Sequence, residues 1–325
     1  MRNLSFSQAT LEAMQEEMRR DERVFIMGED IAKQGGIFGQ FQGLPKEFGY
    51  ERVRDTPISE TALVGAGIGA ALAGAVPVID MHFADFIGVT MDEVLNQMAK
   101  MRYMFGGQAT LPLVLRAPDG VTQSAAAQHS QSLEAWFLHI PGIKVVIPSN
   151  PADAKGLLKA AIRDPNPVIY FEHKNLFRKV GPVPDGDYLT PIGKAAVVRD
   201  GQDVTIVSYS AMLGACLEAA DQLSRQHGIE AEVIDLRTIV PMDLETIYTS
   251  VKKTHRLVIA HEAVKTGGVG GEIAASVSEN IIEYLDAPII RVGAAFTPVP
   301  FSPPLEKRVI PQVEQIVEAV RKARW

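Results

Sequence analysis

The sequence has a single cysteine, Cys216, in 325 residues. One cysteine excludes a disulfide within the chain and any cysteine cluster around a metal. A chain without disulfides is typical of a reducing compartment, so we expect a cytoplasmic protein. The first residues, MRNLSFSQATLEAMQEEMRRDERV, are charged and lack the apolar core of a secretory signal, which favours the same location.

Positive charge is also scarce. The chain carries 32 Lys and Arg against 39 Asp and Glu, a formal net charge of −7, and its basic residues form no cluster. Binding to a phosphate backbone needs a basic patch, so we expect no nucleic-acid partner. The motifs GxxxxGK[ST], HExxH and GxSxG are missing too, which leaves a nucleophilic hydrolase or a zinc enzyme without support.

Long apolar runs are limited to residues 61–79, which carry no charge. A membrane-spanning helix needs about 20 predominantly apolar residues. This run is broken by several glycines and by Pro77, and its last part, VPVI, is typical of a strand. We therefore expect a buried helix followed by a buried strand, with no membrane partner.

Short β-branched runs alternate with segments of helical length along the whole chain. We expect a first set of strands at 24–29, 76–81, 112–117, 143–148 and 167–172, with helices at 5–20, 59–74, 90–105 and 151–163. A second set has strands at 204–210, 230–236, 256–262 and 287–293, with helices at 211–227, 271–285 and 311–323. This alternation predicts an α/β fold with mostly parallel sheets flanked by helices. A stretch rich in Pro and Gly separates the sets, so we predict domains at 1–185 and 203–325 and a linker at 186–202.

The segment DTPISETALVGAGIGAALAG (55–74) places one acid, Glu60, before a helix of very small residues. Thr56 or Ser59 is the expected cap, which puts Glu60 in the first helical turn. A carboxylate there can simply complement the helix dipole, worth about 0.3–1 kcal/mol. Each helical glycine, however, costs about 0.8–1.0 kcal/mol relative to alanine. Their number indicates that a backbone, a subunit or a cofactor approaches closely. GAGIGA is no dinucleotide fingerprint, because no strand runs directly into it.

Three other segments offer candidate chemistry. His82 and Phe86 follow a strand, where ligands bind in open α/β sheets, although the aromatic residues there could equally be core. His129 lies in the polar loop AAAQHSQS and could carry a proton or have a structural role. Asp164 and Asn166 follow a helix; their oxygens would suit a hard cation, but a helix end and a turn explain them as well.

Taken together, several motifs resemble one family. These motifs are DTPISE, FADF, RYMFGGQ, QHSQSLEAWF, HIPGIKVVIPSNPADAKGLLKAAIRDPNPVIYFEHK and DLRTIVPMD. They resemble the beta subunit of the thiamine-diphosphate-dependent decarboxylase component of 2-oxoacid dehydrogenase complexes, over essentially the whole chain. The family includes pyruvate, acetoin and branched-chain members. The resemblance implies a pyrimidine-binding domain, a transketolase C-terminal-like domain, and a heterotetramer of two alpha and two beta chains. The acyl group formed passes to lipoyl on an acyltransferase component.

The resemblance also implies roles for single residues. Glu60 would hydrogen-bond ring nitrogen N1′ of the aminopyrimidine, favouring the imino tautomer that takes a proton from the thiazolium carbon. Phe86 would pack on that ring with Ile58 close by. His129 would project into the active-site channel and assist proton transfer or reductive acylation of lipoyl. A structural potassium site in several members is matched by Leu113, Ala161, Ile162, Asp164 and Asn166.

A last absence concerns the other end of the cofactor. The chain has no GDG tripeptide, the motif with which this family holds magnesium and the diphosphate. We therefore expect the alpha subunit to supply both and the isolated chain to be inactive. The motifs favour acetoin or pyruvate over branched-chain substrates, with His82 as a candidate discriminator. A branched-chain enzyme, or a non-catalytic assembly chain of the same fold, remains the alternative.

Overall fold

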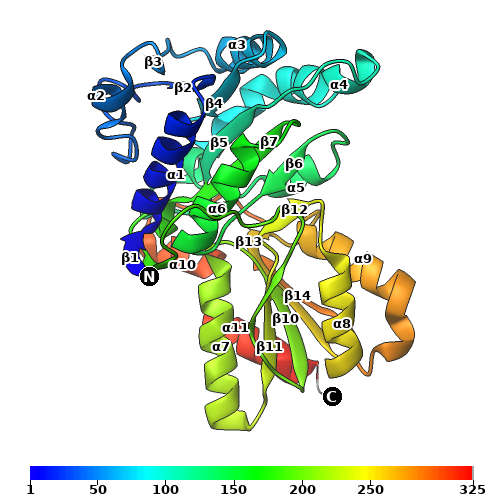
Figure 1. Cartoon of the computed structure of the whole chain (residues 1–325). Helices are drawn as coiled ribbons and strands as arrows, with labels where there is room; N and C mark the ends of the chain where they lie inside the picture. The colour runs from blue at the N-terminus through cyan, green and yellow to red at the C-terminus, as the bar shows by residue number, and fades with distance from the viewer. Residues whose placement is uncertain (324–325) are drawn as a thin grey trace. The chain divides into compact units, whose positions relative to one another are not determined.

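Strands and helices alternate along the computed structural model, which describes residues 1–323 (Figure 1). The fold divides into two units. The first comprises residues 1–119 and 136–192, and the second comprises residues 120–135 together with the chain from 193 onward. The predicted linker at 186–202 and the domain limits beside it stay predictions.

The first unit is built on a parallel sheet with the strand order β6-β7-β5-β4-β2-β3. The strands are β2 (Val24–Gly28), β3 (Val53–Asp55), β4 (Val76–Asp80), β5 (Val114–Asp119), β6 (Lys144–Val146) and β7 (Val168–His173). Every residue of β4, β5 and β7 is buried, as expected for strands that are covered on both faces. Beside this sheet, β1 (Arg2–Ser5) pairs antiparallel with β8 (Val180–Val183).

Helices cover both faces of that sheet. On one face α1 (Phe6–Arg20) packs against α6 (Pro151–Ile162), and both contribute to a core that includes Val76 and Val78. Side chains alternate along a strand, so Ile79 points to the other face, where α3 (Glu60–Leu72) lies against β4. Asn150 caps α6, because its side chain accepts the Asp153 N–H.

The helix expected over 90–105 is wrong as a single element. The 3-10 helix η1 (Ala84–Thr90) ends where that helix was expected to begin, and the segment itself contains the π-helix η2 (Glu93–Met98) and α4 (Met101–Met104). Within η2 the Ala99 N–H donates to the carbonyl of Val94, five residues back, which is the π spacing. Three further short elements are α2 (Leu44–Phe48), η4 (Lys174–Leu176) and α5 (Glu134–Leu138), the last running from the second unit into the first.

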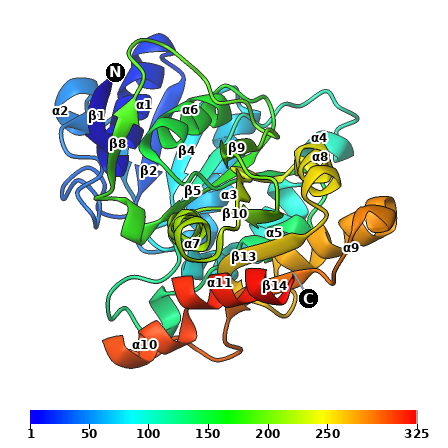
Figure 2. The ribbon, with the colours of Figure 1, turned by 90° about the horizontal axis from the view of Figure 1, so that it is seen from below.

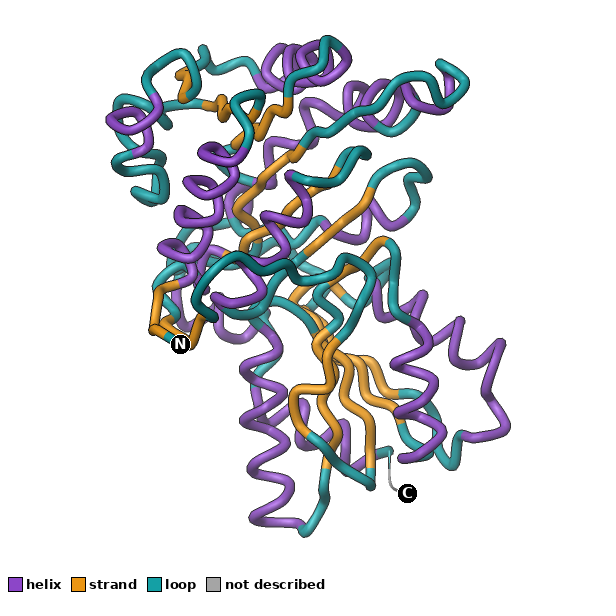
Figure 3. The backbone as a smooth tube through the Cα atoms, viewed as in Figure 1, coloured by secondary structure: helices purple, strands orange, loops and turns teal. Residues whose placement is uncertain are grey.

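The second unit has a sheet with the strand order β14-β13-β10-β11-β9. Its strands, which are orange in Figure 3, are parallel except for β9, which runs antiparallel to β11. The bounds are β9 (Ala196–Arg199), β10 (Val204–Ser208), β11 (Ala231–Asp235), β13 (Leu257–Val264) and β14 (Ile290–Ala294), with a short strand β12 (Thr238–Val240) elsewhere in the unit. Mostly parallel sheets flanked by helices were predicted, and both units confirm it.

In the second unit α7 (Met212–His227) packs against α11 (Val313–Lys322) on one face of the sheet (Figures 1 and 2). On the other side α8 (Leu244–Thr254) packs against α9 (Val269–Ile281). The remaining helical pieces are η3 (Ala127–His129), η5 (Ile282–Tyr284) and α10 (Pro303–Val309). Among the described residues no helix combines the length and apolarity needed to cross a bilayer.

Candidate active site

Glu60 is the first residue of α3, at the edge of the sheet where the parallel strands end. The N-cap is Ser59, so the helix does not begin at the alternative cap, Thr56. The side chain of Ser59 makes no capping hydrogen bond. The strand before it, β3, ends at Asp55, and its register aligns Asp55 with Gly28 of β2. The Thr56 N–H then donates to the Gly28 carbonyl at 2.9 Å, which fixes the turn that leads to Glu60.

Two residues that follow neighbouring strands lie close enough to Glu60 at this edge for its charge to affect their pKa values. Glu29 directly follows β2, and His82 comes two residues after β4 ends. His82 Nδ1 lies 3.8 Å from Glu29 Oε2. Burial raises the pKa of Glu29, and the negative charge of Glu60 raises it further. Burial lowers the pKa of His82, against the pull of nearby acids that include Glu60. The expected pair of Glu60 and His82 is therefore in one electrostatic cluster, and Glu29 is its member that the motifs did not reveal.

The backbone of His82 is unusual. Its φ is 42°, in the left-handed region that residues with side chains rarely adopt. Such conformations persist only where the surroundings hold them, and they collect at functional sites. Here the geometry turns the imidazole of His82 toward Glu29 at the end of β2.

Aromatic residues line the same region of the first unit. Phe86 lies on η1, and its ring meets Phe83 edge-on, with 6.0 Å between ring centroids. Phe83 in turn packs edge-on against Phe38 and is almost fully buried. Phe83 is thus a core residue, whereas Phe86 is only half-buried. Ile58, in the turn before Glu60, is 82% exposed, a high value for an apolar side chain.

A buried charged triad lies in the strands that carry this edge. Asp80 ends β4, Arg116 is on β5 and Glu172 is on β7, and all three are at most 1% exposed. The guanidinium of Arg116 donates to both oxygens of Glu172 and lies 3.9 Å from Asp80 Oδ1. Burial raises the pKa of Asp80 to about 7, although Arg116 opposes the shift. No motif marks the triad, and its only signal in the sequence is one charged residue inside each of three apolar runs.

His129 belongs to the second unit. It ends η3 and is half-buried, and its N–H donates to the Ala126 carbonyl at 3.4 Å. Residues 120–135, which carry it, are grouped with the C-terminal sheet and not with the sheet of Glu60.

The residues matched to a potassium site lie around the end of α6. The Leu113 carbonyl accepts the Val168 N–H at 2.9 Å, and the Ala161 carbonyl accepts the Asp164 N–H at 3.2 Å. The carboxylate of Asp164 binds Lys144 and accepts two hydrogen bonds from Asn166. Among the described residues no group of three or more His, Cys, Asp or Glu could hold a metal. An ion here would have to use backbone carbonyls, including that of Ile162, and the site stays a prediction.

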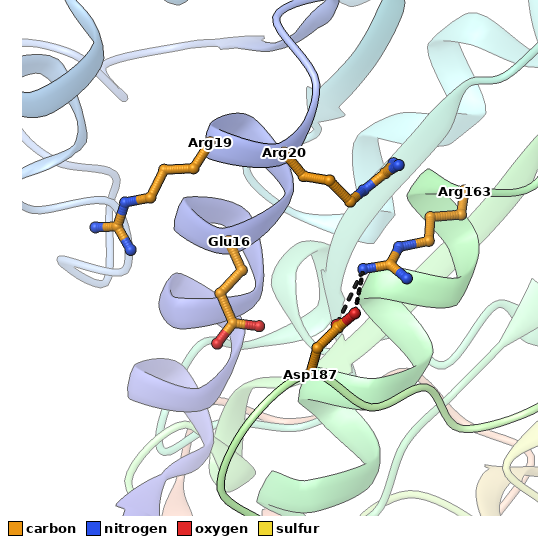
Figure 4. A pocket seen from close by; sticks show the side chains of 5 residues that line it. All are labelled: Glu16, Arg19, Arg20, Arg163 and Asp187. Carbon is orange, nitrogen blue, oxygen red and sulfur yellow. Dashed lines mark hydrogen bonds and ion pairs between the residues drawn. The ribbon is translucent and has the colours of Figure 1, made fainter.

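A hollow of about 350 Å³ lies between α1, α6 and residue 187 (Figure 4). Charged side chains line it: Glu16, Arg19, Arg20, Arg163 and Asp187. Arg163 reaches Asp187 at 3.0 Å, Arg20 and Arg163 both bind Glu17, and Arg19 binds Glu47. The arginines that line this hollow already bind carboxylates, and the ion pair of Arg163 with Glu17 links α1 to α6. None of the predicted site residues lines the hollow.

Comparison with known proteins identifies the class. The model for the transketolase pyrimidine-binding domain matches residues 2–179, and that for the transketolase C-terminal domain matches residues 193–316. A solved split-gene transketolase, described as an inactive beta4 tetramer, superposes with a TM-score of 0.81 over 98% of both chains. At 24% identity this match shows the fold alone. The molecule is thus a transketolase-type two-domain α/β chain.

Sequence relatives narrow the class. The beta subunit of acetoin:2,6-dichlorophenolindophenol oxidoreductase from Cupriavidus necator is 49% identical, over 99% of this chain and 97% of that protein. The beta subunit of the pyruvate dehydrogenase E1 component from Rhizobium meliloti is 47% identical, over 99% of this chain and 70% of that protein. The 2-oxoisovalerate dehydrogenase beta subunit from Bacillus subtilis is 44% identical, over 98% of both chains. The chain belongs to the family of acetoin, pyruvate and branched-chain 2-oxoacid dehydrogenase beta subunits.

Proposed function

We propose that this chain is the beta subunit of an acetoin or pyruvate dehydrogenase and that it works with an alpha subunit and thiamine diphosphate. The observation that carries the proposal is the position of Glu60. Glu60 lies in the first turn of a helix, at the edge where the parallel strands end. A second acid in the same cluster, Glu29, has a raised pKa. Ligands of open α/β sheets bind at this edge.

The residues present fit one end of thiamine diphosphate. An aminopyrimidine ring needs an acid opposite its ring nitrogen and apolar groups against its faces. Glu60 supplies the acid, the half-buried ring of Phe86 supplies a flat surface, and the exposed Ile58 supplies an apolar side chain. The diphosphate end finds no matching motif, because the chain lacks GDG. A partner chain would therefore hold the magnesium and the diphosphate.

When bound, thiamine diphosphate supplies a carbon nucleophile and an electron sink for cleavage of a C–C bond. The residues of this chain would manage protons around it. Glu60 holds a proton at N1′ of the aminopyrimidine. Glu29 belongs to the same cluster, and its own pKa is raised by burial and by the negative charge of Glu60. His129 moves a proton during acyl transfer to lipoyl.

Assembly and substrate complete the proposal. The proposed assembly is a cytoplasmic heterotetramer of two alpha and two beta chains that delivers its acyl group to a lipoyl-bearing acyltransferase. A potassium ion bound by carbonyls near Asp164 would be structural. His82 would contribute to the choice between acetoin and pyruvate, since it lies beside Glu29 at the edge where substrate arrives.

Reconstitution tests this proposal. The chain is mixed with a GDG-containing alpha chain, which we expect in the neighbouring reading frame, and thiamine-diphosphate-dependent oxidation of acetoin, pyruvate and branched-chain 2-oxoacids is measured. We expect turnover of acetoin or pyruvate. Turnover of branched-chain acids alone would reassign the substrate. A stable heterotetramer that oxidises none of them would support the non-catalytic assembly chain instead.

A further inference from the structure

The loop that carries His129 has a backbone that its own sequence does not favour. Ser124 has a φ of 59° and Ala126 a φ of 60°, both in the left-handed region. Neither residue is a glycine, so each conformation costs free energy that the surroundings must offset. Contacts with the rest of the second unit must therefore hold residues 120–135 in this conformation.

One carboxylate holds both ends of this loop. Oε1 of Glu262 accepts the backbone N–H of Val121 at 2.6 Å and faces the hydroxyl of Ser132 at 3.4 Å. Val121 precedes His129 and Ser132 follows it, so Glu262 closes the loop around the histidine. A backbone hydrogen bond from Gly120 to Gln131, at 3.0 Å, joins the same two ends.

Two other contacts support the loop within the second unit. The Ser124 N–H, in the strained part, donates to Glu306 Oε2 at 3.2 Å. The hydroxyl of Tyr209 donates to Glu134 Oε1 at 2.6 Å, just after the loop. Tyr209 follows β10, and Glu262 lies near the end of the parallel strand β13, so both act from the same edge of the sheet.

Glu262 itself stands on a rigid element. Its neighbour His261 is fully buried, donates from Nδ1 to the Ala263 carbonyl at 3.0 Å and stacks on Tyr209. A Cβ atom added at Gly268 would lie 2.7 Å from the His261 ring, so the first turn of α9 closes tightly over it. A carboxylate on such a support can hold a loop to within the tolerance that catalysis needs.

We propose that Glu262 is a positioning residue for His129: it sets the path of the loop and thereby the place of the imidazole. The inference rests on the function proposed above, in which His129 acts in acyl transfer to lipoyl. In this proposal activation of the cofactor is assigned to Glu60, and Glu262 acts on the loop of His129. Loss of Glu262 therefore affects the transfer step and spares the steps before it.

The tether is tested first by amide hydrogen exchange of the full-length chain, without any activity. In Glu262→Ala we expect exchange over residues 121–132 to accelerate about tenfold or more, because a charge-assisted hydrogen bond is lost. Glu262→Gln keeps an oxygen acceptor and should accelerate exchange by about threefold or less. Glu272→Ala, at an exposed acid of α9, is the matched control and should change nothing in the loop. Unchanged loop exchange in Glu262→Ala would overturn the inference.

The consequence is tested in the complex with the alpha chain, with two electron acceptors. We expect Glu262→Ala to slow transfer to a lipoyl domain by about tenfold or more, and dye-linked turnover with 2,6-dichlorophenolindophenol by about twofold or less. Glu262→Gln should restore most of the transfer rate. His129→Ala should slow transfer to the lipoyl domain at least as much as Glu262→Ala does. If His129→Ala leaves the transfer rate unchanged, the role proposed for His129 is wrong. The hydrogen-exchange result then still tests whether Glu262 holds the loop. If Glu262→Ala slows both acceptors equally, the positioning role is wrong.

Discussion

The carboxylates of Asp80 and Glu172 face a single guanidinium, that of Arg116, in a fully buried part of the sheet. Two acids and one base leave a net negative charge unless one acid keeps its proton. A buried net charge is costly, which explains why the pKa of Asp80 rises to about 7 while Arg116 stays paired with Glu172. His82 follows Asp80 by two residues. The acid that keeps its proton is therefore close in the chain to a residue of the candidate site.

Asp80 gives a pH prediction. Its pKa rises from an ordinary value of 3.8 to about 7 on folding, so the folded chain binds the proton more tightly than the unfolded chain. Stability from this group is full below the lower value and is lost as the pH rises through the upper one. Between about pH 5 and about pH 8 the free energy of unfolding should fall by about 1 kcal/mol or more. Asp80→Asn, which mimics the protonated acid, should flatten that fall in urea unfolding. The exposed Glu22→Gln serves as control, and an unchanged slope in Asp80→Asn would contradict the assignment.

Glu60 gives a kinetic prediction. In Glu60→Gln the side chain keeps its shape but no longer holds an acidic proton at N1′. We expect the heterotetramer to assemble normally and turnover to fall by about 10²–10⁴-fold. The comparison is Glu51→Gln, at an exposed acid just before β3, which should retain full activity. A fully active Glu60→Gln enzyme would remove the proposed role.

Single residues differ in how far sequence alone reveals them. Glu60 is marked by its motif and by the helix after it, and His129 by its polar loop. Glu29, Glu262 and the buried triad carry no motif, because their importance arises from residues far along the chain that meet them only after folding. The φ of His82 is likewise set by its surroundings and not by its residue type.

At the scale of the element, α3 shows how one helix meets two different demands. Gly67 faces the sheet, where an added Cβ would lie 2.3 Å from Ile79 Cδ1 and 3.3 Å from Leu113 Cδ1. Gly69 faces outward, with no atom within 4 Å of an added Cβ. The glycines of α3 were expected to allow a close approach by another part of the structure. At Gly67 that close approach is made by β4 of the same chain. The exposed face of α3 remains for the subunit contact that the sequence predicts.

This contrast within one helix predicts opposite effects on stability. Gly67→Ala should destabilise the chain by about 1–3 kcal/mol, because Ile79 is fully buried and must move. Gly69→Ala should stabilise the isolated chain by up to about 1 kcal/mol, since alanine favours helix and nothing obstructs it. Urea unfolding of the two variants measures both. Equal effects would show that packing against β4 does not require the glycine.

The sequence predicted the long regular elements of both sheets because apolar runs and caps are local signals. The helix expected over 90–105 failed at η2, where the backbone adopts a π turn beside α3. The short strand β9 was missed, because a few residues of mixed polarity carry little periodic signal. The 11-residue helix α8 was also missed, although its buried residues Ile247, Val251 and Thr254 recur at helical spacing and give a local signal. Elements shaped by a neighbour, such as η2, carry no comparable local signal.

At the scale of the whole molecule, the chain offers one end of a cofactor site and lacks the other. We expect thiamine diphosphate with magnesium to leave the melting temperature of the isolated chain unchanged. Addition of the alpha chain should raise it by several degrees in a cofactor-dependent way, because a ligand stabilises only the form that binds it. Differential scanning calorimetry measures both. Cofactor-dependent stabilisation of the isolated chain would show that it binds the diphosphate by a route other than GDG.

The second unit includes residues 120–135, which the chain completes before it has finished the first unit. A gene divided between residues 192 and 193 would give a C-terminal fragment without its histidine loop and an N-terminal fragment with that loop cut off from Glu262 and Tyr209. The two halves can therefore not be exchanged among relatives as independent modules. During synthesis on the ribosome, the loop also has to wait for about 130 further residues before the strand that holds it emerges.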